Sequence, residues 1–143
     1  MANVTIDLKS FGLEAAQQAF DKLPIKVQKK VVRPVLRETI KQAQALVVAA
    51  VPVGAGNLKR EMGRTKAKAE KAKRGAVRFV VPMPDRASLG IPHDAKGYYP
   101  AAIEYRPGGS YIRATIDHHG DRLTIAMAVK IAKGIERQAR VTK

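Results

Sequence analysis

Cysteine is absent from this sequence of 143 residues, which excludes disulfide scaffolds, thiolate zinc sites and cysteine nucleophiles. Only three histidines are present, so a metal site would have few imidazole ligands to draw on. Aromatic residues amount to 5% of the chain, a poor supply for a protein that stacks the bases of single strands. The scarce residue types therefore argue against thiol chemistry, most metal chemistry and single-strand recognition.

Long apolar runs are also missing. The longest is Ala45–Val53, well short of the ~20 residues that span a bilayer. The first residues, Met1–Asp7, do not combine a basic segment with a following apolar one, so we expect no signal peptide. We therefore expect a protein that is neither exported nor inserted in a membrane.

Positive charge is what the sequence has in excess, because 27 Lys and Arg against 12 Asp and Glu give a formal net charge of +15. A protein with such a charge repels itself and is usually found beside a polyanion, most often nucleic acid. A second explanation is an assembly subunit whose cations face acidic neighbours. The hydrophobic fraction of 45% favours a globular fold, and the length fits one domain.

The first fifty residues predict a short strand and two helices. Asn3–Leu8 alternates polar and apolar side chains, which indicates a strand, and Ser10 is placed to cap a helix over Phe11–Lys22. Apolar residues recur at spacings of three and four over Ile25–Ala50, which predicts a long helix, kinked where Pro34 lies inside it. The other side of this helix carries a row of cations: Lys26, Lys29, Lys30, Arg33, Arg37 and Lys41.

Proline and glycine then divide the chain. Val51–Leu58 contains two glycines and a proline and predicts a turn. Two strands are expected next, Arg64–Glu70 and Ala76–Val81, joined by a basic hairpin turn at Lys71–Gly75. Because alanine and lysine favour helices, a helix over the alanine- and lysine-rich part is an open alternative. Pro82–Gly97 is rich in proline and glycine and predicts a long surface loop.

The last third predicts a short element at Tyr98–Tyr105 and a C-terminal helix. Leu123, Met127, Ile131 and Ile135 recur every four residues, which predicts helix over Tyr111–Arg140, in two pieces around Gly120. No internal repeat or separate linker is visible. We therefore predict one α+β domain over residues 1–143, in which the long kinked helix and the C-terminal helix pack on a small, mainly antiparallel sheet.

No group of residues predicts an enzyme. The glycines of Gly54–Lys59 are two residues apart after a helix, whereas a phosphate-binding loop needs four residues between its glycines and follows a strand. Asp117, His118 and His119 suit a divalent ion, but adjacent residues on a helix do not face each other, so we expect a polar helix junction at Gly120. Ser110 lacks the surroundings of a nucleophile elbow. We predict no catalytic residue, no metal and no cofactor.

Lys59–Arg78 is the densest basic stretch of the sequence. If Arg64–Glu70 is a strand, Arg64, Lys66 and Lys68 project from one face and follow a phosphate backbone through contacts that are sequence-independent and salt-sensitive. A hairpin whose charges are simply solvated is the alternative. We predict contact with DNA in a channel, or with an acidic partner, through nine cations: Lys59, Arg60, Arg64, Lys66, Lys68, Lys71, Lys73, Arg74 and Arg78.

Three stretches taken together resemble a family of phage proteins. Val51–Lys59 looks like the Pro-x-x-Thr-Gly-x-Leu junction after the long helix of the phage neck family typified by the gene-ten protein of the Hong Kong ninety-seven phage. Tyr98–Tyr105 is similar to that family's Tyr-Ala-x-x-Val-Glu-Phe-Gly segment. Ser110–Ile116 resembles the Pro-Phe-Leu-Arg-Pro-Ala-Leu that opens its last helix. Order and spacing match from about Leu13 onward, with Ala55 where the family usually has threonine.

The resemblance implies a structural virion protein of a tailed bacteriophage that completes the tail or joins it to the head. Such proteins act as rings of identical subunits around the DNA channel, a hexamer being one candidate size, beside tail-terminator, head-completion and portal-side proteins. It implies assembly in the host cytoplasm and a final place in the virion neck or tail. The subunit interface that we assign within these stretches comprises Tyr98, Tyr99, Ile103, Tyr105, Tyr111 and Ile112.

The net charge keeps a second function open, a free basic nucleic-acid-binding protein of the phage or its host. This alternative predicts that the isolated chain binds DNA, with an affinity that falls steeply as salt rises.

Overall fold

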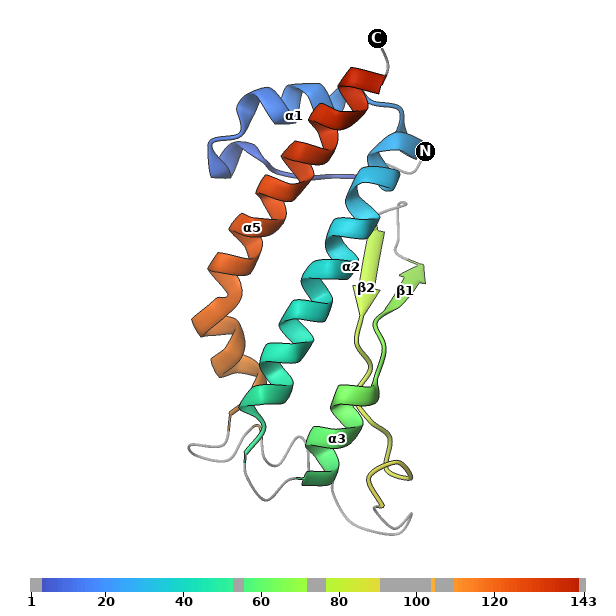
Figure 1. Cartoon of the computed structure of the whole chain (residues 1–143), viewed down its shortest axis with the longest axis vertical. Helices are drawn as coiled ribbons and strands as arrows, with labels where there is room; N and C mark the ends of the chain where they lie inside the picture. Colours follow the sequence, from blue (N-terminus) through green and yellow to red (C-terminus); the bar gives the residue numbers. More distant parts are fainter. Residues whose placement is uncertain (1–3, 53–55, 72–76, 91–103, 105–109, 142–143) are drawn as a thin grey trace.

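The computed structural model describes residues 4–52, 56–71, 77–90, 104 and 110–141. Figure 1 shows α2 and α5, the two long helices, side by side and antiparallel, with α1 across one end of the pair and the β-hairpin along the side of α2 away from α5. The chain is α+β, as predicted. In chain order the elements are the 3₁₀ helix η1 (Lys9–Phe11), α1 (Glu14–Asp21), α2 (Ile25–Ala50), α3 (Gly56–Arg64), β1 (Lys68–Lys71), β2 (Val77–Val80) and α5 (Ile112–Val141).

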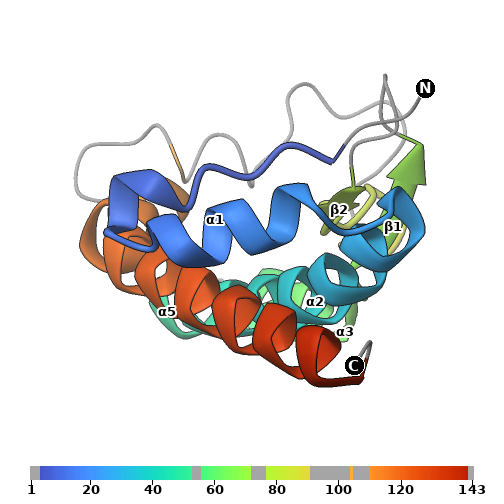
Figure 2. The same cartoon turned by 90° about the horizontal axis from the view of Figure 1, so that it is seen from above.

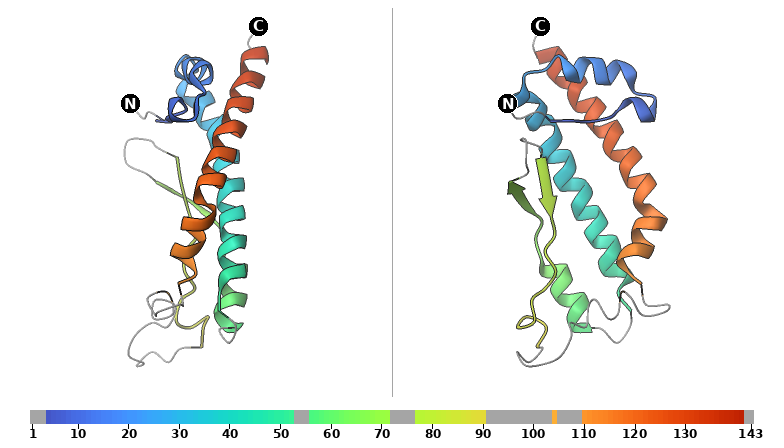
Figure 3. Two further views of the ribbon diagram at one scale, coloured as in Figure 1. Left: turned by 90° about the vertical axis from the view of Figure 1, so that its left-hand side faces the viewer. Right: turned by 180° about the vertical axis from the view of Figure 1, so that it is seen from behind.

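Helix α2 is the central element. It contacts α5, α3 and β2, while α1 contacts α5. Seen from above and from the side, α1 and the hairpin lie on the same side of the α2–α5 pair (Figures 2 and 3). The strands are antiparallel, with Lys68 opposite Val80 and Lys71 opposite Val77. Helix α2 therefore contacts both α5 and the hairpin. It also sets the positions of the side chains on its remaining side.

The core consists of two apolar clusters, one towards each end of the long helices. Each large apolar side chain that is buried in them contributes about 1.5–3 kcal/mol to folding. The larger cluster joins the N-terminal segment, α1, α2 and α5 through Val4, Leu8, Phe20, Val31, Val32, Ala128, Ile131 and Ile135. The smaller cluster joins the end of α2, α3 and the start of α5 through Val51, Leu58, Met62, Leu89 and Tyr111.

Gly134 allows α2 and α5 to approach closely. A Cβ atom added to it would lie 2.9 Å from Cγ1 of Val31, a separation that side-chain carbons do not adopt without movement. Val31 is buried and β-branched, so it has little freedom to give way. The small residue on α5 is therefore matched to the large one on α2.

The predicted strand at Asn3–Leu8 is wrong for the residues that the structure describes, because 4–8 form no strand. The apolar residues of the pattern are buried, since Val4 is 9% and Leu8 1% exposed. The backbone N–H of Leu8 donates instead to Oε1 of the buried Gln17, at 2.8 Å. A side chain on α1 thus takes the place of a partner strand.

Three expectations for the helices are corrected. The first helix is shorter than Phe11–Lys22, because Gly12 adopts a left-handed φ of 73° between η1 and α1, and Ser10 donates to the carbonyl of Asp7 instead of capping α1. The C-terminal helix is continuous through Gly120, not two pieces. Helix α3 occupies residues for which a turn and the start of a strand were predicted.

The predicted bounds of the long helix, Ile25–Ala50, are confirmed, and the helix continues through the exposed Pro34 as one element. The two predicted strands exist but are shorter, Lys68–Lys71 and Val77–Val80. None of the described helices combines the length and apolarity that crossing a bilayer requires.

Candidate nucleic-acid interface

The cations of the predicted basic segment are spread over several elements. Lys59, Arg60 and Arg64 lie on α3, Lys66 follows it, and Lys68 and Lys71 lie on β1 with Arg78 opposite on β2. The prediction that Arg64, Lys66 and Lys68 share one strand face is wrong, because α3 extends to Arg64 and β1 begins at Lys68. Lys73 and Arg74 lie outside the described residues.

Three of these cations have acidic partners within the same segment. Oε1 of Glu61 lies 3.3 Å from Nε of Arg60 and 3.3 Å from Nη1 of Arg64. Nε of Arg78 lies 3.5 Å from Oε2 of Glu70. Exposed pairs of this kind add only about 0–1 kcal/mol to stability, but they offset local charge. The segment is therefore less positive in space than it looks in sequence.

A second set of cations lies along α2, and we call it the α2 cation row. Its members recur at helical spacings and share one side of α2 around a shallow hollow of about 660 Å³. With 15 steps from first to last, the row is about 22 Å long at 1.5 Å per residue. Within the part of the chain that the structure describes, none of its members has an ion-pair partner. The row comprises Lys26, Lys29, Lys30, Arg33, Arg37 and Lys41.

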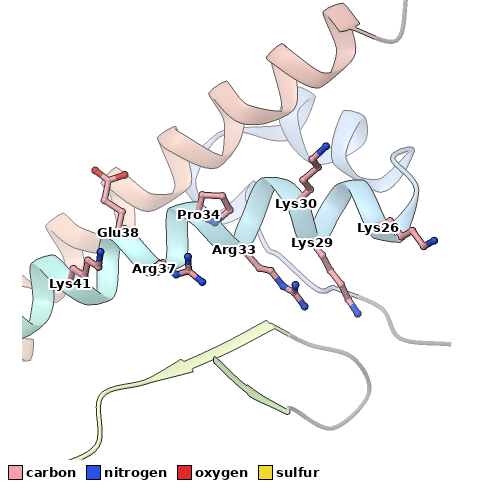
Figure 4. A pocket seen from close by; sticks show the side chains of 8 residues that line it. All are labelled: Lys26, Lys29, Lys30, Arg33, Pro34, Arg37, Glu38 and Lys41. Atoms are coloured by element: carbon pink, nitrogen blue, oxygen red, sulfur yellow. The ribbon is translucent and has the colours of Figure 1, made fainter. Parts of the chain in front are cut away.

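The hairpin bounds the row on one side, as Figure 4 shows. Lys29 and Arg33 point toward the side on which the hairpin lies, and the guanidinium of Arg37 lies 5.4 Å from the centre of the Phe79 ring on β2. Among the described residues that line the hollow, Glu38 is the one acid; like Lys30, it points away from the hairpin, and its Oε1 accepts a 2.6 Å hydrogen bond from Lys130 on α5. The described lining therefore holds six cations and one acid, and that acid already has a partner on α5.

Glu104 is a buried carboxylate that binds the first turn of α5. Its Oε2 accepts from the backbone N–H groups of Tyr111 at 2.9 Å and Ile112 at 2.8 Å. Its Oε1 accepts from Ser110 Oγ at 3.0 Å, and from the backbone N–H of Arg113 at 3.0 Å and its Nε at 3.3 Å. A helix N-terminus leaves its first N–H groups without intrahelical partners and carries partial positive charge, so a carboxylate there satisfies both needs.

These contacts lower the pKa of Glu104 to about 2. Burial acts to raise the pKa, but it is outweighed by the combined hydrogen bonds from the N–H groups of Ile112, Arg113 and Tyr111 and from the Ser110 hydroxyl. Glu104 is therefore ionised at any physiological pH, and it joins the chain before α5 to the helix itself.

The residues assigned to a subunit interface divide into three groups. Tyr111 is fully buried in the smaller core cluster, so its assignment to an interface is corrected: its ring packs inside its own subunit. Ile112 is half-buried beside that cluster and stays a candidate. Tyr98, Tyr99, Ile103 and Tyr105 lie outside the described residues.

The three stretches that carry the family resemblance meet at this end of the molecule. Val51 and Leu58, from the first stretch, share the smaller core cluster with Tyr111 of the third. Glu104, from the second stretch, binds the N–H groups of the third and pairs with Arg113 at 3.3 Å. Residues up to 62 positions apart in sequence thus form one junction.

Asp117, His118 and His119 lie on the uninterrupted helix α5, so the predicted helix junction at Gly120 is wrong. The two imidazole rings meet edge to face, with centres 5.0 Å apart. Among the described residues, no three His, Asp or Glu side chains are grouped so as to hold a metal ion.

Comparisons of the chain with protein-family models, curated protein sequences and solved structures found no match.

Two features were present in the sequence but were given no role there, the α2 cation row and Glu104. The six cations of the α2 row were visible as one helix face, and their regular spacing, compared with the acids interspersed in Lys59–Arg78, was the signal that distinguishes the two sets. The bonds of Glu104 had no comparable signal, because its partners lie six to nine residues away and the contact depends on the fold.

Proposed function

We propose that this chain is a structural subunit of a tailed bacteriophage, which completes the tail or joins it to the head as part of a ring around the DNA channel. The observation that carries the proposal is the convergence of the three resembling stretches on one junction. Glu104 stands where the second stretch of the family has its glutamate, and Arg113 stands where the third has its arginine. In this chain the two side chains pair with each other.

This pairing supports the resemblance because it gives the short motifs a common physical reason. A carboxylate before the last helix and an aromatic residue at its first turn are needed together, since one binds the N–H groups and the other fills the core below. Val51 and Leu58 of the first stretch lie more than 50 residues before Tyr111 of the third, so their contact depends on the fold. The α2 cation row adds support, because a subunit beside a DNA channel needs cations that its own acids do not neutralise.

Disruption of the gene in the phage that carries it tests the proposal. We expect DNA-filled heads and separate tails that fail to join, observed by electron microscopy of lysates, and recovery of infectious particles when the intact gene is supplied in trans. A Glu104→Ala copy should fail to restore joining, whereas a copy with the exposed Glu136→Ala change on α5 should restore it. Normal infectious particles from the disrupted phage would contradict the proposal.

The net charge of +15 favours a second candidate, a free basic nucleic-acid-binding protein. The two functions differ in where the chain is found at the end of infection. A ring subunit is present in purified particles at a fixed number of copies per particle, whereas a free protein stays in the lysate. Quantitative mass spectrometry of purified particles separates them.

A further inference from the structure

The α2 cation row and the basic segment Lys59–Arg78 differ in what already surrounds their charges. In the segment, Glu61 and Glu70 pair with three arginines. The row has no ion pair among the described residues, and its nearby acid, Glu38, is bonded to Lys130 on the far side. Like charges along one helix face add up to a positive potential that attracts an anion to the row. The row is the better candidate for an external polyanion.

The row is long enough to contact several phosphates of a duplex. Six cations are distributed over about 22 Å of helix. One strand of a duplex presents a phosphate for about every 3.4 Å of its axis, and the phosphates wind around that axis. A straight row of this length therefore meets some of the phosphates on the face turned toward it, through contacts that do not read the bases.

The surroundings favour a duplex over a single strand. Proteins that hold single strands stack the bases on exposed aromatic rings. Of the aromatic side chains that the structure describes, Phe20 and Tyr111 are buried, Phe79 lies beneath Arg37, and the partly exposed Phe11 lies on η1, outside the hollow. No described ring is therefore available beside the row to take a base.

The lining of the hollow also argues against an acidic protein as its occupant. Protein interfaces have an apolar centre and are depleted in lysine. Among the described residues that line the hollow, Pro34 is the one without a polar side chain, and the other apolar surface comes from the stems of the cations. No large apolar side chain is among these lining residues to serve as an anchor.

We propose that the α2 cation row binds the phosphate backbone of double-stranded DNA without regard to its sequence. The inference rests on the proposed function for its setting, a subunit beside packaged DNA, and names the face of the subunit that meets it. It differs from the sequence-based prediction, which assigned that role to Lys59–Arg78.

The test compares two triple variants of the full chain that remove the same charge. The row variant is Lys26→Gln, Lys29→Gln, Arg33→Gln, and the control is Lys59→Gln, Lys66→Gln, Lys68→Gln. Binding of a labelled duplex of about 20 base pairs is followed by fluorescence anisotropy from about 50 to about 200 mM salt. Circular dichroism confirms that each variant is folded, and a Lys26→Arg, Lys29→Arg variant shows that charge, not side-chain shape, is needed.

We expect the slope of log affinity against log salt to become shallower by about 2–3 in the row variant, because each lost phosphate contact removes about 0.9. The control should change the slope by less than about 1. Equal effects of the two variants, or no binding by the unaltered chain at low salt, would overturn the proposal. Equal affinity for polyglutamate of the same total charge would assign the row to an acidic protein instead.

A negative result in the DNA-binding test can be told apart from a failure of the proposed function. If gene disruption blocks head–tail joining while the purified chain ignores duplex DNA, the row assignment is rejected and the assembly role stands. If the chain binds duplex DNA through the row and disruption leaves particles intact, the assembly role is rejected.

Discussion

Glu104 and the α2 cation row are both concentrations of charge, but their surroundings are opposite. Glu104 is 6% exposed and its two oxygens accept bonds from a hydroxyl, three backbone N–H groups and a guanidinium of its own chain. Five members of the row are exposed and Lys29 is half-buried, and none has an ion pair among the described residues. The Glu104 carboxylate is therefore bonded within its own chain, whereas the cations of the row can bind an external anion.

The difference separates two uses of charge in one small protein. A buried carboxylate at a helix start stabilises the fold, because losing it would leave N–H groups without partners. Exposed cations in a row contribute little to stability and much to the electrostatic field that draws an anion to the surface. Substitutions at the two places should therefore have different effects.

Glu104→Ala should have the largest effect on stability. Loss of the carboxylate leaves the N–H groups of Tyr111, Ile112 and Arg113 without their acceptor, and we expect the free energy of unfolding to fall by about 2–4 kcal/mol. Urea unfolding measures it, with Glu136→Ala on the exposed side of α5 as control, expected within about 0.5 kcal/mol of the unaltered chain. Equal stability of the two variants would show that the carboxylate does not cap α5.

Acid should reveal the same carboxylate. Because its pKa is lowered in the fold, from 4.5 to about 2, its contribution is complete above the unfolded-state pKa and is lost as the pH falls through that interval. We expect the unaltered chain to lose about 1–3 kcal/mol more than Glu104→Gln over this range. Urea unfolding at a series of acidic pH values checks it, and parallel curves for the two proteins would contradict it.

Two glycines of α5 test the close packing of α5 on α2, the helix that carries the row. Gly120→Ala meets only Ile116, at an ordinary 3.7 Å, and should gain about 0.5–1 kcal/mol from helix propensity. Gly134→Ala meets Val31 at 2.9 Å and should be about 1–3 kcal/mol less stable than Gly120→Ala. Thermal or urea unfolding measures the difference. If Val31→Ala does not improve the Gly134→Ala protein relative to the sum of the single changes, the close contact is not the cause.

Arg37 lies over the Phe79 ring on β2, and its replacement should show the smallest measurable effect. Arg37→Ala loses the contact with Phe79 and should cost about 0.5–1 kcal/mol, whereas Arg33→Ala should stay within about 0.5 kcal/mol of the unaltered chain. A double-mutant cycle with Phe79→Leu isolates the interaction. Additive effects of Arg37→Ala and Phe79→Leu would show that the two side chains do not stabilise each other.

The fold could be predicted from the sequence where a pattern was long. Ile25–Ala50 has more than two dozen residues of consistent helical spacing, and its bounds were correct despite Pro34. Gly120 was given too much weight as a helix breaker, because one glycine costs only about 1 kcal/mol and α5 recovers more through its buried face. Helix α3 was missed, since it begins at Gly56 within a glycine-rich stretch and is only nine residues long.

The sequence was enough to predict a cationic surface, but not which of its cations lack acidic partners in the fold. Charge density along the sequence pointed to Lys59–Arg78, and density alone does not show that Glu61 and Glu70 lie against its arginines. The junction at Glu104 depends on its bonds to Ser110 and Tyr111, a tertiary relation without a local pattern. Both differences from the sequence-based expectation have one cause, because the partners of a charge are set by the fold.

Urea unfolding with and without duplex DNA tests the contrast between the two regions most directly. A ligand that binds only the folded chain raises its stability, by about 2.7 kcal/mol at 100 times its Kd. Without DNA, we expect the variant Lys26→Gln, Lys29→Gln, Arg33→Gln to be as stable as the unaltered chain. When DNA is added, its free energy of unfolding should rise far less than that of the unaltered chain. An equal gain in both proteins would contradict it.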